Sequence, residues 1–329
     1  MKVAVVILNW NGKELLKKFL PPVIAHSKEA DIYVADNAST DGSVAFTKVH
    51  FPTVHIIQNE SNGGYAKGYN DALKQIKADV FCLLNSDVEV SNGWLEPIID
   101  MFKAEPNTAI VQPKLLDYRN KSFFEYAGAA GGFIDKYGYP YCRGRIFNTI
   151  EKDLGQYNDT TNIFWASGAC FFIRSSVFKT LNGFDESFFA HMEEIDLCWR
   201  AQNAGYIIKF CGTSEVFHVG GATLNSQNPK KTFLNFRNSL FTLTKNAKGN
   251  LLFILFPRLV LDGIAGIKFL IELKPKHTIS IIKAHFAFYW KFLHLIKQRK
   301  SQKNKIKYYK KTSVVIDYFV NNKKHYKSL

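Results

Sequence analysis

The chain has 329 residues, of which 47% are hydrophobic, so it can bury one large core and an appendage. Its five cysteines are scattered and form no C-x-x-C pair, which argues against a disulfide framework or a thiolate zinc site. The apolar run that follows Met1 and Lys2 is too short for a secretion signal. We therefore expect a cytoplasmic protein.

The positive charge is concentrated at the C-terminal end. The net charge is +15, and residues 268–329 alone contain 16 Lys and Arg against two acidic residues, Glu272 and Asp317. The other 267 residues contain 27 Lys and Arg and 26 acidic residues. The sequence therefore predicts a neutral globule with a basic tail, and such a tail favours an anionic partner, either phospholipid or nucleic acid.

The first 112 residues alternate short apolar runs with amphipathic segments of helical length. The apolar runs are Val3–Leu8, Ile32–Ala35, Val54–Ile57, Val80–Leu84 and Ala109–Val111. Runs without polar alternation are typical of strands buried on both faces, as in a parallel sheet covered by helices. The pattern predicts a doubly wound α/β fold with a mostly parallel sheet.

The middle of the chain is less regular. Residues 113–180 are rich in Gly and Tyr, and we expect loops and an antiparallel excursion there. A helix is predicted from about Met192 to Asn203, ended by Gly205 in the left-handed conformation. Residues 206–249 are expected to form short strands and a mobile loop.

The tail is predicted to carry two apolar helices. We divide the chain into a catalytic domain, residues 1–245, and this helical basic tail, residues 246–329. In the first helix, Leu251–Leu273, the polar residues share about one third of the helix circumference. They are Arg258, Asp262, Lys268 and Glu272. One face of the second helix carries Lys283, Lys291, His294 and Lys297.

Two placements of these amphipathic helices are open. A charge in the middle of a membrane-spanning helix costs about 2.5–3.5 kcal/mol, so neither segment is expected to cross a bilayer. Each helix either lies in the plane of an anionic leaflet or packs on the catalytic domain with its basic face in solvent. The membrane placement is favoured for the second helix.

Polar residues cluster directly after each of the first four apolar runs. The clusters are Asn9-Trp10-Asn11-Gly12, Asp36-Asn37-Ala38-Ser39-Thr40-Asp41-Gly42, Asn59-Glu60-Ser61-Asn62-Gly63-Gly64 and Asn85-Ser86-Asp87. Because ligands bind beyond the carboxyl ends of strands in an open α/β sheet, the four clusters predict a nucleotide-sized pocket. No G-x-G-x-x-G opens the first helix and no P-loop lysine is present, which argues against dinucleotide and P-loop ATP sites.

Several of these residues allow both a structural and a ligand-binding interpretation. Asp36 either stabilises a turn or accepts the imide N–H of uracil or thymine. Gly63 and Gly64 either form a turn or remove side chains where the backbone approaches a ligand. Asp87 follows a buried strand, where a carboxylate is costly unless it binds something, and hard divalent ions prefer such oxygen ligands. A diphosphate leaving group requires that neutralising charge.

Seven motifs follow one another in a fixed order. They are N-W-N-G, D-N-A-S-T-D-G-S, N-G-G-Y-A-K-G-Y-N, L-N-S-D-V, W-A-S-G-A-C-F-F-I-R, G-F-D-E-S-F-F-A-H-M-E-E-I-D-L-C-W-R and F-H-V-G-G-A-T. The ordered set resembles glycosyltransferase family 2, closest to its rhamnosyltransferase-like branch with the GT-A fold. The resemblance runs from residue 3 to about residue 223. The ordered set is highly specific, although each motif alone is not.

The resemblance implies a donor site for a nucleotide sugar and a divalent metal ion, Mn²⁺ or Mg²⁺. The donor-binding residues would be Asn9, Asn11, Asp36, Asn62, Gly63, Gly64, Asn70, Asn85 and Ser86. Asn85 and Asp87 stand in the family's D-x-D metal motif, and the Asn at its first position leaves Asp87 as the stronger ligand. His218 matches the family's third metal ligand, although a lone His after an apolar run is otherwise more often structural.

On the acceptor side, the resemblance implies roles for Trp165, Ser167, Gly168 and Glu193. Trp165 either offers a stacking face to a sugar or belongs to the core. Glu193 and Glu194 stand where the family has Glu-Asp, whose second acid is the general base, so Glu194 is one methylene longer. Two acids in the first turn of a helix are also ordinary partners of the helix dipole. Burial would raise the pKa of Glu194 and the helix N-terminus would lower it.

The implied function is inverting transfer of a sugar, such as rhamnose, from a UDP- or dTDP-sugar to a glycan acceptor. We expect a lipid-linked acceptor in cell-surface polysaccharide synthesis, and an enzyme held peripherally on the inner face of the cell membrane by its tail. One alternative is a nucleotidyltransferase that makes the sugar nucleotide, although residues 7–13 lack its Gly-rich loop. The other is a nucleic-acid-binding protein that uses the tail. It leaves the four polar clusters unexplained, so no nucleic-acid partner is expected.

Overall fold

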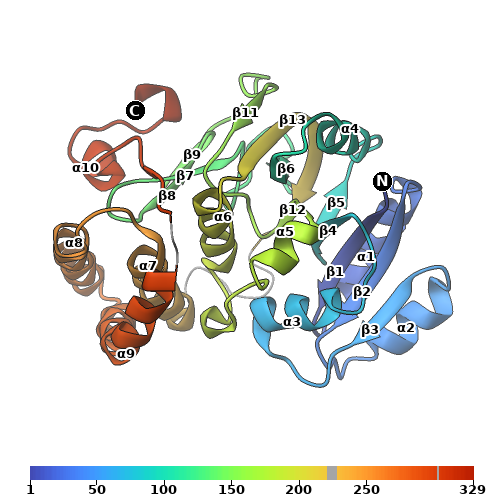
Figure 1. Ribbon diagram of the computed structural model, residues 1–329, viewed down its shortest axis with the longest axis horizontal. Coiled ribbons are helices and arrows are strands. Elements are labelled where there is room, and N and C mark those ends of the chain that lie inside the picture. The colour runs from blue at the N-terminus through green and yellow to red at the C-terminus, as the bar shows by residue number, and fades with distance from the viewer. Residues whose placement is uncertain (221–227, 302–303) are drawn as a thin grey trace.

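A nine-stranded, mostly parallel sheet forms the centre of the molecule (Figure 1). The computed structural model describes residues 1–220, 228–301 and 304–329. The strands of this sheet are β1 (Val3–Asn9), β2 (Ala30–Asp36), β3 (His55–Gln58), β4 (Val80–Asn85), β5 (Val88–Val90), β6 (Thr108–Asp117), β11 (Thr160–Asn162), β12 (Cys170–Arg174) and β13 (Ile207–His218). Their order is β11-β13-β6-β12-β4-β1-β2-β3, and β5 pairs with β13 outside this path.

The N-terminal half is doubly wound, as predicted. β1 lies between β2 and β4, β2 also pairs with β3, and all three pairings are parallel. The helices of this half are α1 (Lys13–Ala25), α2 (Ser43–His50), α3 (Gly64–Leu73) and α4 (Glu96–Ala104). Residues 80–84 are wholly buried because both faces of β4 are covered. The predicted α/β class with a mostly parallel sheet is confirmed.

The antiparallel strands expected within residues 113–180 form a second, smaller sheet. Its four strands are β7 (Gly132–Ile134), β8 (Pro140–Cys142), β9 (Arg145–Ile146) and β10 (Thr149–Ile150). After β12 come α5 (Ser175–Thr180), the 3-10 turn η1 (Glu186–Phe188) and α6 (Glu193–Asn203). The prediction for α6 is confirmed, and Gly205 after its end has a φ of +92°.

The prediction for residues 206–249 is wrong in its larger part. Instead of short strands, residues 207–218 form one long strand, β13, with a bulge between Cys211 and Glu215. Residues 229–246 form the helix α7 (Pro229–Asn246), where a loop was expected. The remainder of the expected loop, residues 221–227, lies outside the described residues. The buried face of α7 includes the polar residues Asn238, Thr242 and Asn246, which are all fully buried. The sequence of α7 therefore lacks the apolar stripe by which a packed helix is usually predicted.

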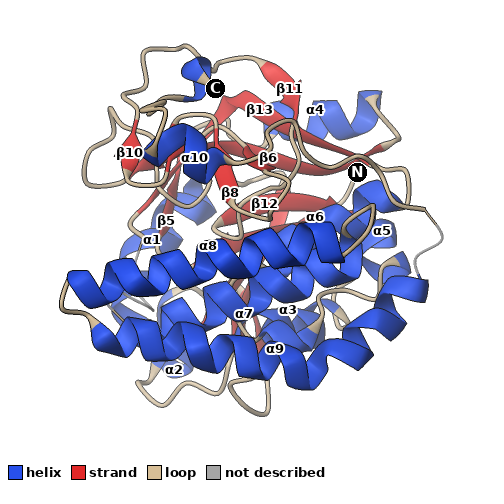
Figure 2. Ribbon diagram, turned by 90° about the vertical axis from the view of Figure 1, so that its left-hand side faces the viewer, coloured by secondary structure: helices blue, strands red, loops and turns tan. Residues whose placement is uncertain are grey.

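The C-terminal segment forms the two predicted helices, α8 (Leu252–Ile271) and α9 (Pro275–Ser301). They lie side by side across one flank of the molecule, with α7 behind them (Figure 2). The inner face of α9 is buried at Ile281, Ala284, Phe288 and Leu295. The chain then returns to the small sheet through α10 (Val314–Phe319) and η2 (Tyr326–Ser328). The predicted boundary after residue 245 falls one residue before the end of α7, and the division into domains stays a prediction.

Two of the four polar residues predicted on α8, Arg258 and Asp262, face the protein, whereas Lys268 and Glu272 are exposed. Arg258 is 3% exposed and Asp262 is fully buried, and the two form an ion pair of 2.7 Å. Asp262 also accepts from the hydroxyl of Tyr139 at 2.9 Å, and its other oxygen lies 3.2 Å from His285 Nε2 on α9. Among the described residues, no helix combines the length and the apolar character needed to cross a bilayer.

Candidate active site

The carboxyl ends of the parallel strands meet at one edge of the sheet, which brings the four polar clusters together. Asn9 at the end of β1 is level with Asp36 at the end of β2, and Leu8 is level with Asn85 at the end of β4. The backbone N–H of Asn59, after β3, donates to the carbonyl of Asp36 at 2.8 Å. This register places every cluster beside another, as a pocket at the strand ends requires.

Asp36 is buried and already hydrogen-bonded at both carboxylate oxygens. Its Oδ1 accepts from Asn9 Nδ2 at 2.9 Å, and its Oδ2 accepts from the backbone N–H of Ser39 at 2.8 Å. Asn11 Oδ1 accepts from the backbone N–H of Thr40 at 2.7 Å, which ties the first cluster to the second. Asp36 therefore stabilises the turn, and each oxygen keeps a second lone pair. With 1% of Asp36 exposed, a base could reach it only along a narrow approach.

The third cluster ties α3 to the segment that precedes α6. Gly64 has a φ of +81°, and a Cβ on it would lie 2.4 Å from the carbonyl oxygen of Phe189, so only glycine fits. Its N–H donates to Asn62 Oδ1 at 3.0 Å. Asn70 uses both ends of its amide on the backbone of Phe184, at 2.9 Å each. These contacts give Gly64 and Asn70 structural roles next to the candidate pocket.

The predicted donor residues divide by exposure. Three are buried: Asn9, Asp36 and Asn70. Six keep surface that is partly or fully exposed: Asn11, Asn62, Gly63, Gly64, Asn85 and Ser86. A donor molecule would therefore contact the second group directly, while the first group supports the strand-end loops that carry it.

Asp87 and His218 come together although 131 positions separate them in the sequence. β13 pairs with β5, which places His218 opposite Val88. The Nε2 of His218 lies 3.2 Å from Asp87 Oδ1, and its Nδ1 lies 3.2 Å from Oε1 of Glu125. All three side chains are buried. Burial lowers the pKa of His218, but the carboxylates of Glu125 and Asp87 outweigh burial and raise it to about 10.

A divalent ion would replace the proton that this raised pKa keeps on His218 Nε2, and the pair of Asp87 and His218 then fits an ion that shares its coordination with a substrate. Two neighbouring ligands of an octahedral ion bound at about 2.1 Å lie about 3 Å apart, close to the separation of Asp87 Oδ1 and His218 Nε2. Asn85 Nδ2 is 3.5 Å from the same ring nitrogen. Within the described residues, no group of three or more His, Cys, Asp or Glu is placed to hold a metal. Mg²⁺ commonly uses one or two protein carboxylates and takes its other ligands from water and phosphate.

Glu193 and Glu194 open helix α6 in a desolvated environment. One carboxylate oxygen of each, Oε2, is buried and has no hydrogen-bond partner among the described residues. Burial raises the pKa of Glu194 to about 7, against the opposing effect of the backbone N–H groups of its own helix. Burial and the neighbouring Glu194 raise the pKa of Glu193 as well. Burial thus outweighs the helix N-terminus, a balance that the sequence leaves open.

Tyr65 on α3 connects this acidic pair to the strand ends. Its hydroxyl donates to the carbonyl of Gly168 at 2.8 Å, and both glutamates contribute to raising its pKa, after burial. The next residue, Ala169, accepts a hydrogen bond of 2.9 Å from the backbone N–H of Asn85. The acids of α6 and the D-x-D-like segment therefore belong to one region of the molecule.

The segment that leads into α6 is held in a costly backbone conformation. Phe189, His191 and Met192 have φ values of +65°, +71° and +72°, and such conformations cost about 1–3 kcal/mol each for residues other than glycine. Asn238 on α7 stabilises them, because its Nδ2 donates to the carbonyls of residues 188, 190 and 191 at 3.0, 2.9 and 2.7 Å. The direction in which α6 presents its acids is thus fixed from α7.

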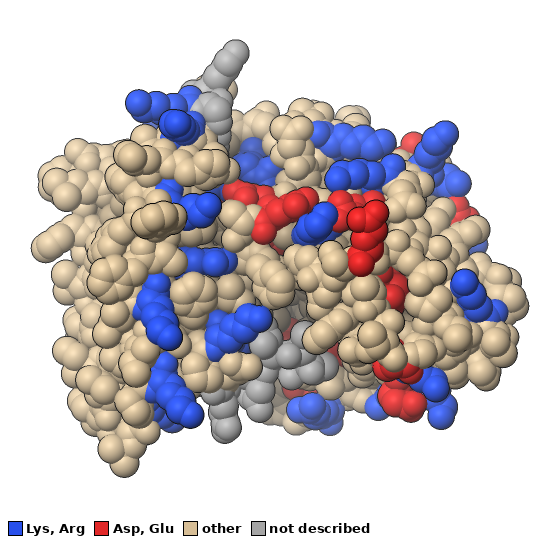
Figure 3. All heavy atoms as spheres, turned by 90° about the horizontal axis from the view of Figure 1, so that it is seen from below, with Lys and Arg blue, Asp and Glu red and all other residues tan. Residues whose placement is uncertain are grey.

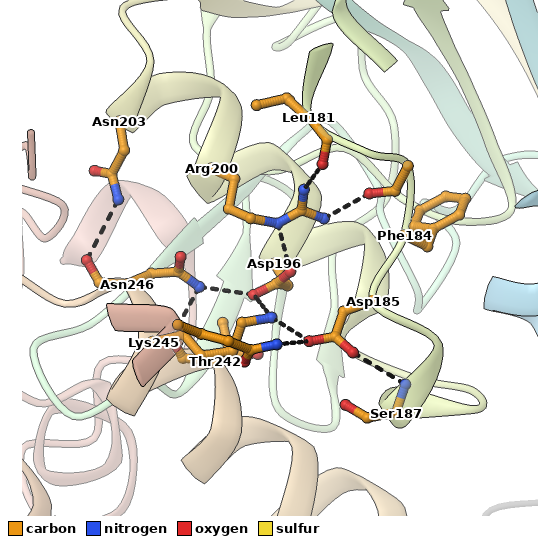
Figure 4. Close-up of polar contacts among 12 residues, drawn as sticks. Leu181, Phe184, Asp185, Ser187, Asp196, Arg200, Asn203, Thr242, Lys245 and Asn246 are labelled. Carbon is orange, nitrogen blue, oxygen red and sulfur yellow. Dashed lines mark hydrogen bonds and ion pairs between the residues drawn. The ribbon is translucent and has the colours of Figure 1, made fainter. Parts of the chain in front are cut away.

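A buried ionic network fixes the other side of α6 (Figure 4). Asp196, which is fully buried, lies 2.8 Å from Arg200 Nε and 3.0 Å from Lys245 Nζ, and accepts from Asn246 Nδ2 at 2.8 Å. Lys245 also pairs with Asp185 at 2.6 Å. Burial favours the neutral acid, but Lys245 and Arg200 hold the pKa of Asp196 below its usual value. The network joins α6, α7 and the segment between α5 and α6.

The residues predicted on the acceptor side are mostly internal. Trp165 is 2% exposed, and its indole N–H donates at 2.8 Å to a backbone carbonyl of β7, so the core interpretation fits it better than sugar stacking. Ser167 is 1% exposed, and its N–H donates to Gln112 Oε1 at 2.8 Å. Gly168 keeps partial exposure and accepts from Tyr65, as described above. Through Tyr65, Gly168 is connected to the region of the acidic pair.

The sequence interpretation missed two residues that support the site, Glu125 and Asn238. Glu125 stands in an irregular stretch, F-F-E-Y-A-G, without metal-ligand spacing. Asn238 lies in the segment predicted to be a loop. Neither position carries a sequence signal, because both act on partners that are distant along the chain.

Comparison with known proteins supports one family. The family model described as glycosyl transferase family 2 matches residues 4–181. N-acetylglucosaminyl-diphospho-decaprenol L-rhamnosyltransferase of Mycobacterium tuberculosis is 25% identical over 231 residues, which are 65% of this chain and 75% of that protein. Rhamnosyltransferase WbbL of Escherichia coli is 25% identical over 227 residues, 66% of this chain and 83% of that protein.

Solved structures show the same architecture. The structure of GalNAc-T7 with UDP, GalNAc and Mn²⁺ superposes with a TM-score of 0.54 at 18% identity. The match covers 66% of this chain but 43% of GalNAc-T7, so this chain spans less than half the length of that protein. The expected GT-A fold is thereby confirmed, and the matched family model covers more than half of the residues. The chain belongs to glycosyl transferase family 2.

Proposed function

We propose that this glycosyltransferase is an inverting, metal-dependent enzyme that transfers a sugar from a UDP- or dTDP-sugar to a lipid-linked glycan. Rhamnose is the favoured sugar, because two relatives are rhamnosyltransferases, and one of them acts on a diphospho-decaprenol acceptor by its name. A role in cell-surface polysaccharide synthesis follows from an acceptor of this class. The enzyme would work peripherally at the cytoplasmic side of the membrane that holds the acceptor.

The observation that carries this proposal is the half-buried side chain of Glu194, whose Oε2 is buried and unpartnered and whose pKa is raised to about 7. A carboxylate with this pKa is a stronger base than an exposed glutamate and is still ionised near neutral pH. Glu194 accepts the proton of the acceptor hydroxyl as the hydroxyl oxygen bonds to the anomeric carbon. The bond from that carbon to the diphosphate oxygen breaks, and the configuration inverts.

Asp87 and His218 would hold the divalent ion, which would neutralise charge on the leaving diphosphate. Glu125 Oε1 lies 3.2 Å from His218 Nδ1, and Nε2 faces Asp87. Asn85 and Ser86 would contact the donor beside this pair, and Asn11, Asn62 and the Gly63-Gly64 turn would border it. Asp36 would receive the base, provided that the base reaches its remaining lone pairs.

A transfer assay tests this function. The purified chain is incubated with dTDP-rhamnose or with UDP-sugars, with Mn²⁺ or Mg²⁺, and with a polyprenyl-diphosphate N-acetylglucosamine acceptor. The product should carry the anomeric configuration opposite to that of the donor, measured by NMR. A product that retains the donor configuration would overturn the inverting mechanism. Release of pyrophosphate from a nucleoside triphosphate and a sugar phosphate would instead identify the nucleotidyltransferase alternative.

A further inference from the structure

The outer surface of α8 and α9 exposes large apolar side chains along most of its length. On α8, Phe253 is 66% exposed and Phe256 is 64% exposed, and Ile264 continues the same face. On α9, Phe286 is 69% exposed and Trp290 is 88% exposed. Large apolar side chains are scattered singly on most soluble surfaces, whereas here they form two parallel rows on adjacent helices. We call this surface the α8–α9 outer face.

The amphipathicity of the first part of α8 is inverted relative to a helix on the surface of a soluble domain. Such a helix buries its apolar stripe and exposes its charges. In α8, the charged residues Arg258 and Asp262 are buried in an ion pair, and they meet Tyr139 and His285 inside the protein. The charged side chains of this part of α8 are thus paired inside the protein, while its phenylalanine and isoleucine side chains are exposed. This arrangement requires an apolar medium, rather than water, on the outer side.

Lysines lie at the edges of the α8–α9 outer face and, on α9, also along it. The exposed lysines of this segment are Lys268, Lys274, Lys276, Lys283, Lys291, Lys297 and Lys300. The segment contains two acidic residues, of which Asp262 is buried and Glu272 pairs with Lys268 and Lys274. Seen from below, Lys and Arg form a column over the left half of the molecule, and the left margin shows neither charge (Figure 3). An apolar strip bordered by ammonium groups is complementary to acyl chains beneath anionic headgroups.

We propose that the α8–α9 outer face inserts into one leaflet of an anionic bilayer, with both helices parallel to the membrane plane. The two helices lie in one layer across this flank, so both rows of apolar side chains can enter the same leaflet (Figure 2). Their lysines then lie at the level of the lipid phosphates, and Trp290 lies at the interface, where tryptophan is enriched. A second copy of the chain is a poorer occupant, because a symmetric pairing of this face would bring the lysine borders together. The inference specifies the membrane location proposed above and does not depend on the donor or the metal.

Vesicle co-sedimentation of the full chain tests the insertion. The double variant Phe256→Asp/Phe286→Asp should bind vesicles of phosphatidylcholine and phosphatidylglycerol about ten-fold or more weakly than the wild type, since each change removes an aromatic side chain that the bilayer would bury. Leu154→Asp is the matched control, because Leu154 is 77% exposed and lies away from both helices. It should bind as the wild type does. Equal binding of the double variant and the wild type would overturn the proposal.

Ionic strength separates insertion from simple charge attraction. Wild-type binding should weaken in high salt but persist, because apolar burial is not screened. Complete release in salt, with no loss in the double variant, would mean that lysines alone hold the protein. A wild-type dimer that the double variant dissociates, with no vesicle binding by either, would assign the face to a second copy and overturn the proposal.

Tryptophan quenching tests the depth and orientation. Lipids brominated on their acyl chains should quench wild-type fluorescence, and Trp290→Phe should remove most of that quenching while it leaves binding nearly unchanged. Of the other four tryptophans, Trp10 alone is substantially exposed, and it lies at the strand ends. Quenching that survives in Trp290→Phe and disappears in Trp10→Phe would place the strand ends, rather than α9, at the membrane. Transfer to a water-soluble acceptor should be unchanged in all of the α8–α9 variants, which separates this test from that of the enzyme's chemistry.

Discussion

Glu194 is where burial and the helix N-terminus act in opposite directions on one carboxyl group. Burial prevails and its pKa rises to about 7. Since the base acts in its ionised form and this pKa is that of the free enzyme, kcat/KM should increase as the pH rises through about 7 and then level off. Glu194→Gln should lower kcat by about 10²–10⁴-fold without loss of donor binding. Glu194→Asp should keep part of the activity. Steady-state kinetics with donor-binding calorimetry measures both effects.

Glu193→Gln is the control for this assignment. The variant retains the helix and removes only the neighbouring acid, so its kcat should fall less than that of Glu194→Gln. A fully active Glu194→Gln combined with an inactive Glu193→Gln would exchange the two roles.

The same carboxyl group also makes stability depend on pH. Its folded pKa lies above the value near 4.3 of an unfolded chain, so the folded state binds the proton more tightly between these values. This contribution to stability is therefore lost as the pH rises from about 4.3 through about 7. Glu194→Gln should melt at a higher temperature than the wild type at pH 8 and at nearly the same temperature at pH 5. Equal melting temperatures at pH 8 would show that Glu194 is hydrated in solution.

Glu125 should act on the metal through His218. Glu125→Ala removes the partner of His218 Nδ1 and should weaken Mn²⁺ binding by about 10–100-fold, the usual effect of losing such a partner. Glu125→Gln keeps an amide oxygen that can lie beside Nδ1 and should lose less. Electron paramagnetic resonance of free Mn²⁺, with UDP present, measures the affinity without a transfer reaction. Asp87→Ala should be more severe, and unchanged binding in Glu125→Ala would remove Glu125 from the site.

At the scale of elements, α7 positions α6. Asn238→Ala removes the donor shared by three carbonyls in the strained segment before α6 and should cost about 1–3 kcal/mol of stability. Because that segment orients Glu194, kcat should also fall while donor affinity changes little. Thermal unfolding and steady-state kinetics test this pair of effects. Asn107→Ala, at an exposed position far from the site, is the control and should change neither.

The strands that the sequence predicts best are those whose environment is simplest. β1, β2 and β4 lie within a few residues of their predicted runs, because strands covered on both faces are apolar throughout. β13 was missed because Gly212, Thr213 and Ser214 interrupt its pattern at the bulge, where the strand continues in spite of them. Residues 229–246 were expected to include a loop because they are rich in polar residues, but in α7 several of these residues are buried and hydrogen-bonded.

The candidate site was predicted less completely than the fold. The order of the motifs brought Asp87, His218 and Glu194 to attention. The motifs do not distinguish a side chain that faces a ligand from one that forms hydrogen bonds with the protein backbone. Asn70 is of the second kind, since its amide forms two hydrogen bonds with the backbone of Phe184. The motifs also give no sign of residues such as Glu125, which lies in an irregular segment and contacts His218. Which side chains face a ligand, and which contact other parts of the protein, depends on where distant parts of the chain meet.

At the scale of the whole molecule, the tail packs against the rest of the protein with one side and forms the α8–α9 outer face with the other. The inner residues of α9 are buried, and Tyr308 and Val314 beyond it are buried as well. Removal of residues 250–329 would uncover the apolar side of α7 and should give aggregated protein rather than a soluble transferase. Expression with separation of soluble and insoluble fractions tests this. A soluble, active fragment of residues 1–249 would show that the catalytic part folds alone.

The position of β12 has a consequence for folding during synthesis. β12, residues 170–174, lies between β4 and β6, which both precede it in the chain and do not pair with each other. β6 therefore cannot join the sheet that contains β4 until residue 174 has left the ribosome. Until then β4 presents an unpaired, apolar edge, the kind of surface on which nascent chains aggregate. β6 keeps an open edge for longer, because its other neighbour, β13, is made only when residue 218 is reached. Nascent-chain chaperones would therefore be needed most while residues 118–218 are being made.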